Sequence, residues 1–251
     1  MIRWLNKEAL QVGQFEILGR LPGFVHGFST RLGGVSSGDY GSLNIGPNTA
    51  DSPEAIRENR RRFFDVFHAE EKRAAIPGQV HGDHIAIIEK PGFYPETDGL
   101  ITATPGVLLT VQTADCVPVF IVDPVKNVAG LFHAGWRGTA ANIVGQGVEI
   151  MTRKFGSAPA NLTASIGPSI GPCCFEVGDE VLKHFPLNTV EGQHVDLWAA
   201  NQQQLVASGL QDVYIKSASM CTFCQQHLFY SHRRDQGVTG RMMAVLGINF
   251  I

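Results

Sequence analysis

The sequence predicts an α/β (α+β) fold, a single domain over residues 1–251 in which mixed β-sheets are layered with helices. Apolar runs of strand length follow one another through the middle of the chain, and a short turn joins the clearest pair. Two longer segments, residues 53–69 and 139–155, have the periodicity of amphipathic helices. No regular strand–helix alternation runs through the middle, so a mixed sheet covered by helices is favoured over a doubly wound one.

The N-terminal part of the chain is rich in turn residues. The segment "STRLGGVSSGDYGSLNIG", residues 29–46, has the glycine and serine density of a long loop. A loop of this length inside a compact domain is usually functional or mobile. The chain has no internal repeat and no long Pro/Gly/Ser linker, which supports one domain.

The first predicted helix has a clear N-terminal signal. Ser52 can cap it and Pro53 suits its first position. Ile56, Phe63 and Phe67 recur on one side, and the arginines fall largely on the opposite side. We therefore expect this helix to pack its apolar side against a sheet.

The remaining elements follow in order along the chain. Strands are predicted at residues 84–89, 106–113, 117–123, 128–133, 162–167, 213–218 and 242–248. The turn "PVKN" joins the third and fourth of these strands as a hairpin. The helix at 139–155 ends at Gly156, and further helices are predicted at 179–185 and 197–208.

Composition excludes several classes of function. The formal net charge of −3 gives no electrostatic reason to expect nucleic-acid binding. No apolar stretch has the length of a membrane span, and the N-terminus lacks the apolar core of a signal peptide, so we expect a cytoplasmic protein without a membrane partner. The five cysteines, an odd number, favour free thiols or metal ligands over a disulfide framework.

Three residues at strand boundaries form the strongest candidate site. They are His81 in "QVHG", Cys116 in "TADC" and His133 in "HAGWRG". Two histidines and one cysteine suit zinc with one open position, and the same set suits a type of copper centre. Cys116 and His133 could equally form a nucleophile–base pair, and spacing alone does not decide between these readings. His84 is the competitor of His81.

The other four cysteines offer weaker candidates. Cys221 and Cys224, with His227, have half of a zinc-finger spacing in "CTFCQQH", or form a redox pair. No second ligand pair follows them, so a closed site would need distant ligands. Cys173 and Cys174 are adjacent, and we expect at most one of them to face a cleft.

Several arginines could hold an anion. The candidates are Arg31, Arg60, Arg137 and Arg233. Arg137 is the best placed, because it follows Gly135 at the start of a helix, where backbone N–H groups favour anions. Arg60 lies in a run of three arginines that is otherwise typical of a solvated helix face.

The motifs together resemble a known family. "STRLGGVS", "SLNIG", "ENRRRF", "QVHG", "TADCVPV", "HAGWRGT", "IGPSIGPCCFEVG" and "FYSHRRD…TGRM" occur in this order from about residue 24 onward. They are similar to those of the YfiH-type family, also called multicopper polyphenol oxidoreductase or laccase-domain proteins. The chain departs from the family at His232, where a tyrosine is usual, and Cys224 lies outside the family motif.

The resemblance implies a fold, a metal and an activity. The implied fold is similar to the catalytic domain of cytotoxic necrotizing factor, with zinc held by His81, Cys116 and His133. The implied activities are phosphorolysis of adenosine, inosine and methylthioadenosine, and deamination of adenosine. For these reactions we expect Arg60 and Arg137 to bind phosphate, Asn44 to bind a substrate hydroxyl, and Asp115 to support a ligand histidine.

Other functions stay open from sequence. One is a cysteine-dependent hydrolase or amidase acting on cell-wall precursors, and another is a metal-binding or thiol-regulated interaction protein. A complete four-copper laccase is excluded, because the chain has nine histidines and no H-x-H pair. Cu²⁺ in the His81–Cys116–His133 set, with a polyphenol oxidase side activity, is the most that the laccase name allows. The chain is expected to be a monomer or homodimer.

Overall fold

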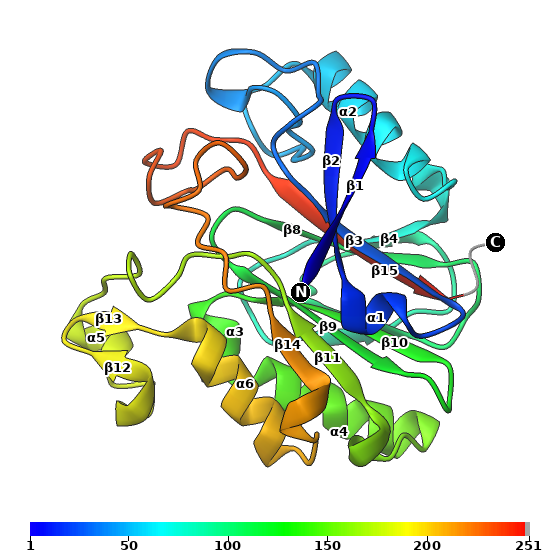
Figure 1. Ribbon diagram of the computed structural model, residues 1–251, viewed down its shortest axis with the longest axis vertical. Coiled ribbons are helices and arrows are strands. Elements are labelled where there is room, and N and C mark those ends of the chain that lie inside the picture. The colour runs from blue at the N-terminus through cyan, green and yellow to red at the C-terminus, as the bar shows by residue number, and fades with distance from the viewer. Residues whose placement is uncertain (249–251) are drawn as a thin grey trace.

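Two β-sheets packed face to face form the centre of the computed structural model, which describes residues 1–248 (Figure 1). The first sheet has the order β1 (Ile2–Lys7), β2 (Leu10–Phe15), β3 (Phe24–Ser29), β15 (Met242–Ile248), β8 (Leu108–Thr113), β4 (Ala74–Pro77) and β6 (Gly92–Tyr94). The second has the order β14 (Ile215–Ser217), β11 (Thr163–Ile166), β9 (Val117–Asp123), β10 (Val128–Ala134), β7 (Gly99–Thr102) and β5 (Ile85–Ile87).

Helices cover the outer face of each sheet, so the molecule has four layers (Figure 1). Helix α2 (Pro53–Asp65) covers the first sheet, and α4 (Ile143–Phe155) and α6 (Leu197–Ala207) cover the second. Three apolar clusters fill the spaces between these layers, and the central one joins both sheets through residues such as Phe28 and Phe120. The mixed α/β class predicted from sequence is confirmed.

Smaller elements connect these layers. They are the helices α1 (Glu16–Gly19), α3 (Trp136–Ala140) and α5 (Asp179–Leu182), the hairpin of β12 (Val190–Glu191) and β13 (His194–Val195), and 3₁₀ helices at Gly38–Tyr40, Glu71–Arg73, Pro159–Asn161, Leu187–Thr189 and Asp212–Tyr214. No helix within residues 1–248 is long and apolar enough to cross a membrane.

Helix α2 begins where its sequence signals place it. The Ser52 hydroxyl accepts a hydrogen bond from the Ala55 N–H, and Ile56, Phe63 and Phe67 are buried. Arg60 does not follow its neighbours to the solvent side. Its guanidinium is buried under the helix, unlike the solvated helix face of which such an arginine run is typical.

Two other expectations differ from the structure. The helix predicted at 139–155 is divided into α3 and α4, because Asn142 takes a left-handed conformation with φ of 60° between them. Asparagine tolerates this conformation better than most residues, and Gly156 ends α4 in the same conformation, as predicted. The N-terminal region also holds three strands, β1 to β3, that its turn-rich composition concealed.

Candidate metal centre

The hairpin of β9 and β10 positions Cys116 and His133. The two strands are antiparallel, with His133 paired to Pro118 and Ala134 paired to Val117. This register brings Cys116, just before β9, opposite Gly135, just after β10. A methyl group added at Gly135 would lie 3.1 Å from the Cys116 sulfur and 3.4 Å from the His81 ring, so glycine leaves room for the site.

His81 completes a trio with these two residues. One donor atom from each of His81, Cys116 and His133 lies within 4.8 Å of the other two. The two imidazole rings are 5.0 Å apart between centroids and stand nearly perpendicular, at 74°. His133 is buried, Cys116 is half-buried and His81 is exposed, so the trio opens to solvent on the His81 side. The structure therefore brings the three predicted ligands together.

The buried carboxylate of Asp98 supports two members of the trio. Its Oδ1 lies 2.7 Å from His133 Nδ1, which leaves Nε2 as the free ligand atom of that ring. The same carboxylate accepts hydrogen bonds from the backbone N–H groups of Val80, His81 and Gly82. Asp98 thereby orients His133 and fixes the loop that carries His81, as a carboxylate partner of a ligand histidine does.

The charges of the trio favour a thiolate beside an imidazolium when no cation is bound. Burial opposes ionisation of Cys116, but His133 and His81 outweigh it and lower the thiol pKa to about 6. Burial likewise disfavours the charged form of His133, but Cys116 and Asp98 raise its pKa to about 9. Burial raises the pKa of Asp98, and the His133 contact and the Gly82 N–H reverse that shift, leaving it lowered. The site is thus built to hold its sulfur as a thiolate.

The supporting carboxylate is not the one expected from sequence. Asp115 instead accepts hydrogen bonds from Thr222 Oγ1, Ser231 Oγ and the backbone N–H of Arg233, at 2.6, 3.0 and 2.7 Å. It anchors a C-terminal loop beside Cys116 rather than a ligand histidine. Asp98 was missed because it is 35 residues from His133 in the chain and enters the site only through the pairing of β7 with β10.

His84, the competitor of His81, lies outside the trio. Its side chain is exposed, and its Nδ1 lies 3.1 Å from the Glu96 carbonyl oxygen.

Two of the expected substrate-binding residues are engaged with the protein itself. Arg60 forms an ion pair with Glu71 and donates to the Ile45 carbonyl, so its guanidinium is engaged within the protein, and its binding of phosphate stays a prediction. The Asn44 amide donates to Thr49 and Asp51, and its oxygen accepts from the N–H groups of Gly46 and Arg241. Every polar atom of the Asn44 side chain is thus used within the protein, and its contact with a substrate hydroxyl stays a prediction.

The remaining arginines differ in their freedom to bind an anion. Arg31 donates to the carbonyls of Gly41 and Gln226, and Arg233 donates to the Glu176 carbonyl. Arg137 is exposed at the start of α3, two residues after Gly135, with its guanidinium over the Trp136 ring at 4.3 Å. Arg137 thus remains a candidate for an anion.

Arg241 is a candidate that the sequence reasoning missed. Its guanidinium donates to the carbonyls of Thr239 and Gly240 through one nitrogen. Burial lowers its pKa, and the charges of Cys116 and Asp115 partly offset that shift. The sequence feature that could have indicated Arg241 is its position in the "TGRM" motif.

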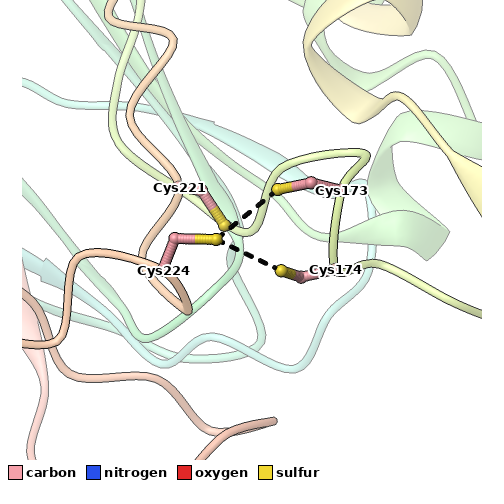
Figure 2. Close-up of side chains that lie close together, drawn as sticks. All are labelled: Cys173, Cys174, Cys221 and Cys224. Carbon is pink, nitrogen blue, oxygen red and sulfur yellow. Dashed lines mark hydrogen bonds between the residues drawn. The ribbon is translucent and has the colours of Figure 1, made fainter.

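The other cysteines gather into a second cluster (Figure 2). The sulfurs of Cys173, Cys174, Cys221 and Cys224 lie within 4.8 Å of one another. His227 is exposed and outside this group. Although Cys173 and Cys174 are adjacent in the sequence, both of their sulfurs contact Cys224.

Fold and trio together define a mixed α/β protein with a His/Cys/His cluster that could hold a metal ion at the end of a central hairpin. Residues 25–249 match the family described as multi-copper polyphenol oxidoreductase laccase. The chain belongs to this family, and the resemblance drawn from its motifs is confirmed.

Similar proteins with curated names are enzymes. The chain is 39% identical over 247 residues to purine nucleoside phosphorylase YlmD of Geobacillus stearothermophilus, with 90% of each chain covered. It is 33% identical to adenosine deaminase RL5 of an unknown prokaryotic organism, covering 84% of this chain and 88% of that one. The crystal structure of YlmD from Geobacillus stearothermophilus superposes with a TM-score of 0.91 at 34% identity, covering 99% of both chains.

Proposed function

We propose that this chain is a zinc-dependent purine nucleoside phosphorylase that also deaminates adenosine. The observation that carries the proposal is the trio itself, two imidazoles and a thiol converging at one end of the β9–β10 hairpin with Asp98 behind them. Relatives similar over most of the chain are named purine nucleoside phosphorylase and, in one case, adenosine deaminase. Adenosine, inosine or methylthioadenosine and phosphate are the proposed substrates.

The donor set of the trio fits zinc. In a tetrahedral zinc site with ordinary bond lengths, nitrogen and sulfur donors are about 3.3 to 3.8 Å apart. The donor atoms of the trio, all within 4.8 Å of one another, need only a small adjustment to reach that spacing. Three protein ligands leave one position for a reactant, which is typical of catalytic rather than structural zinc.

Each residue around the trio has a separate task in the proposed reactions. A zinc ion at this position supplies Lewis-acid polarisation of an oxygen group and activation of water. Asp98 keeps the proton of His133 on Nδ1 and so presents Nε2 to the site. Arg137, exposed two residues after Gly135, and Arg241, whose pKa responds to the charge of Cys116, are the cations that we expect to orient phosphate. Phosphorolysis and deamination would thus share one centre.

Product analysis tests this proposal. The purified chain is incubated with adenosine, with and without phosphate, and the products are separated. Adenine and ribose 1-phosphate are expected only with phosphate. Inosine is expected in both reactions, and with phosphate part of it should be cleaved further to hypoxanthine. His133→Ala should lower both rates by at least about 100-fold, because losing a ligand costs more than losing its supporting partner.

A control variant and two contrary outcomes complete this test. His84→Ala should retain both activities, since His84 lies outside the trio. If the zinc-loaded protein forms neither product, or if His133→Ala matches the unaltered chain, the proposed function is wrong.

The contact between Cys116 and His133 also favours a second candidate, a cysteine-dependent hydrolase or amidase. Alkylation separates the two functions. If Cys116 is a zinc ligand, it is alkylated only after zinc is removed, and reloading zinc protects it. Rapid alkylation of Cys116 in protein that keeps its zinc would favour the nucleophile instead.

A further inference from the structure

Two turns far apart in the sequence carry the four-cysteine cluster (Figure 2). Cys173 and Cys174 lie in the turn that begins at Gly171, where the N–H groups of Cys174 and Phe175 both donate to the Gly171 carbonyl. Cys221 and Cys224 lie in a second turn, closed by the bond from the Gln225 N–H to the Cys221 carbonyl. Side chains alternate along a strand, but a tight turn can direct neighbours to one side, which is why both adjacent cysteines reach the cluster.

The sulfur separations fit one tetrahedral ion. Cys224 Sγ lies 3.7 Å from Cys173 Sγ and 3.4 Å from Cys174 Sγ. Four thiolates around a zinc ion at its usual bond length are about 3.8 Å apart. A disulfide would need about 2.05 Å between two sulfurs. A polynuclear iron–sulfur cluster would hold thiolates on different irons, and therefore farther apart than sulfurs around a single ion.

The surroundings of Cys221 favour a thiolate. The backbone N–H of Gly171 donates to its sulfur at 3.2 Å. Burial raises the pKa of Cys221, but the N–H groups of Gly171 and Cys224 reverse that shift and lower it. Cys173 shows the opposite tendency, since partial burial and the contacts with Cys221 and Cys224 raise its pKa to about 11. Four close sulfurs can ionise together only beside a cation.

We propose that Cys173, Cys174, Cys221 and Cys224 bind a single zinc ion as a closed, four-thiolate structural site. The exposed side chains of Cys173 and Cys224 give a metal ion access from solvent. Four protein ligands leave no position for a substrate, so this site has no part in the reaction. Thiolate ligands and tetrahedral geometry select zinc over the oxygen-preferring cations.

The site holds a loop that braces the trio. Thr222, between the two cysteines of the second turn, donates its hydroxyl to Asp115, the neighbour of Cys116. Its N–H donates to the Ser169 carbonyl, and the Ser169 N–H donates to the Met220 carbonyl. A zinc ion would therefore clamp the two turns on either side of these bonds and stabilise the wall beside Cys116.

Metal content of the full chain tests the site apart from the proposed function. In the double variant His81→Ala, His133→Ala the trio cannot hold a metal, yet about one zinc ion per chain should remain. Cobalt substitution of this variant should give the absorption of tetrahedral cobalt with strong thiolate charge-transfer bands. Adding Cys224→Ser should abolish the cobalt spectrum and the remaining zinc.

Further variants keep the test decisive. Cys173→Ser, at an exposed ligand, should give the same loss if Cys224→Ser prevents folding. His227→Ala is the matched control, since it alters the third member of the "CTFCQQH" spacing but should keep the zinc. The proposal is overturned if the double variant binds neither zinc nor cobalt, if it holds iron instead, or if mass spectrometry shows a disulfide among the four cysteines. None of these outcomes depends on enzymatic activity.

Discussion

The trio and the four-cysteine cluster are built on different kinds of scaffold. The trio lies at the ends of β9 and β10, in the middle of the second sheet, and a buried carboxylate orients it. The four-cysteine cluster lies on two turns, and two of its sulfurs are on exposed residues. Backbone N–H groups, rather than a carboxylate, assist its ionisation.

The two scaffolds suit the two proposed roles, a reacting centre at the trio and a structural centre at the four-cysteine cluster. A reacting centre needs ligands held in place and one position left free, which strand ends and Asp98 provide. A structural centre needs only that its ligands close around the ion, and turns can adjust to do so. The two regions meet at Asp115. It immediately precedes Cys116 in the chain, and its carboxylate accepts a hydrogen bond from the hydroxyl of Thr222, which lies between two cysteines of the cluster.

Among substitutions outside the ligands themselves, the largest effect is expected from Asp98→Asn. An amide of the same size keeps one acceptor oxygen but loses the charge that pairs with His133, and it faces the N–H groups of Val80 and Gly82 with its own donors. Loss of such a partner costs about 10- to 100-fold in metal affinity or activity. Zinc affinity and kcat/KM for adenosine measure the loss.

The comparison predicts that this loss is confined to the trio. Zinc retained by the four-cysteine cluster should be unchanged in Asp98→Asn. An equal loss of metal from both clusters would show that they do not behave as separate sites.

Local patterns were sufficient to predict much of the fold. The strands at 117–123 and 128–133 form continuous buried runs, and α2 has a capping residue with regular apolar spacing. Strands β1 to β3 were missed because a turn-rich loop follows them and hides a weaker alternation. The members of the trio were predicted from motifs that each lie at a strand boundary.

Local patterns could not predict contacts between residues that are far apart in the sequence. Asp98 reaches His133 only through the register of β7 on β10, which no local motif encodes. Cys173 and Cys221 belong to turns about fifty residues apart. The spacing of Cys221 and Cys224 therefore did not indicate which residues would complete a four-cysteine cluster. Arg60 looked solvated because its partner, Glu71, lies beyond the helix end.

A smaller effect is expected from Asp115→Asn, which tests the connection between the two regions. Its Oδ2 accepts from Ser231 Oγ and the Arg233 N–H, and an amide nitrogen at that place accepts neither. Asparagine tolerates the positive φ of 89° at this position, so backbone strain does not confuse the result. We expect a loss of about 1 to 2 kcal/mol in the free energy of unfolding, measured by urea denaturation.

An exposed aspartate provides the matched control for that variant. Asp212 accepts one hydrogen bond from Gln202 at the surface, and Asp212→Asn should change the unfolding free energy by less than about 0.5 kcal/mol. If both substitutions cost the same, Asp115 has no special part in joining the two regions.

The smallest effect is expected from Gly135→Ala, which probes how closely the trio is packed. Gly135 has a φ of −65°, so alanine fits its backbone and any loss comes from contact. The new methyl group would lie 3.1 Å from Cys116 Sγ and 3.4 Å from the His81 ring, close enough to displace them by a few tenths of an ångström. Crowding of this kind costs about 1 kcal/mol, the low end for overpacking, or about fivefold in zinc affinity at the trio. Gly19→Ala, whose methyl group meets no atom closer than 4.0 Å, should leave that affinity unchanged. Equal zinc affinities in Gly135→Ala and the unaltered chain would mean that the trio tolerates displacement and is less rigid than its strand-end scaffold implies.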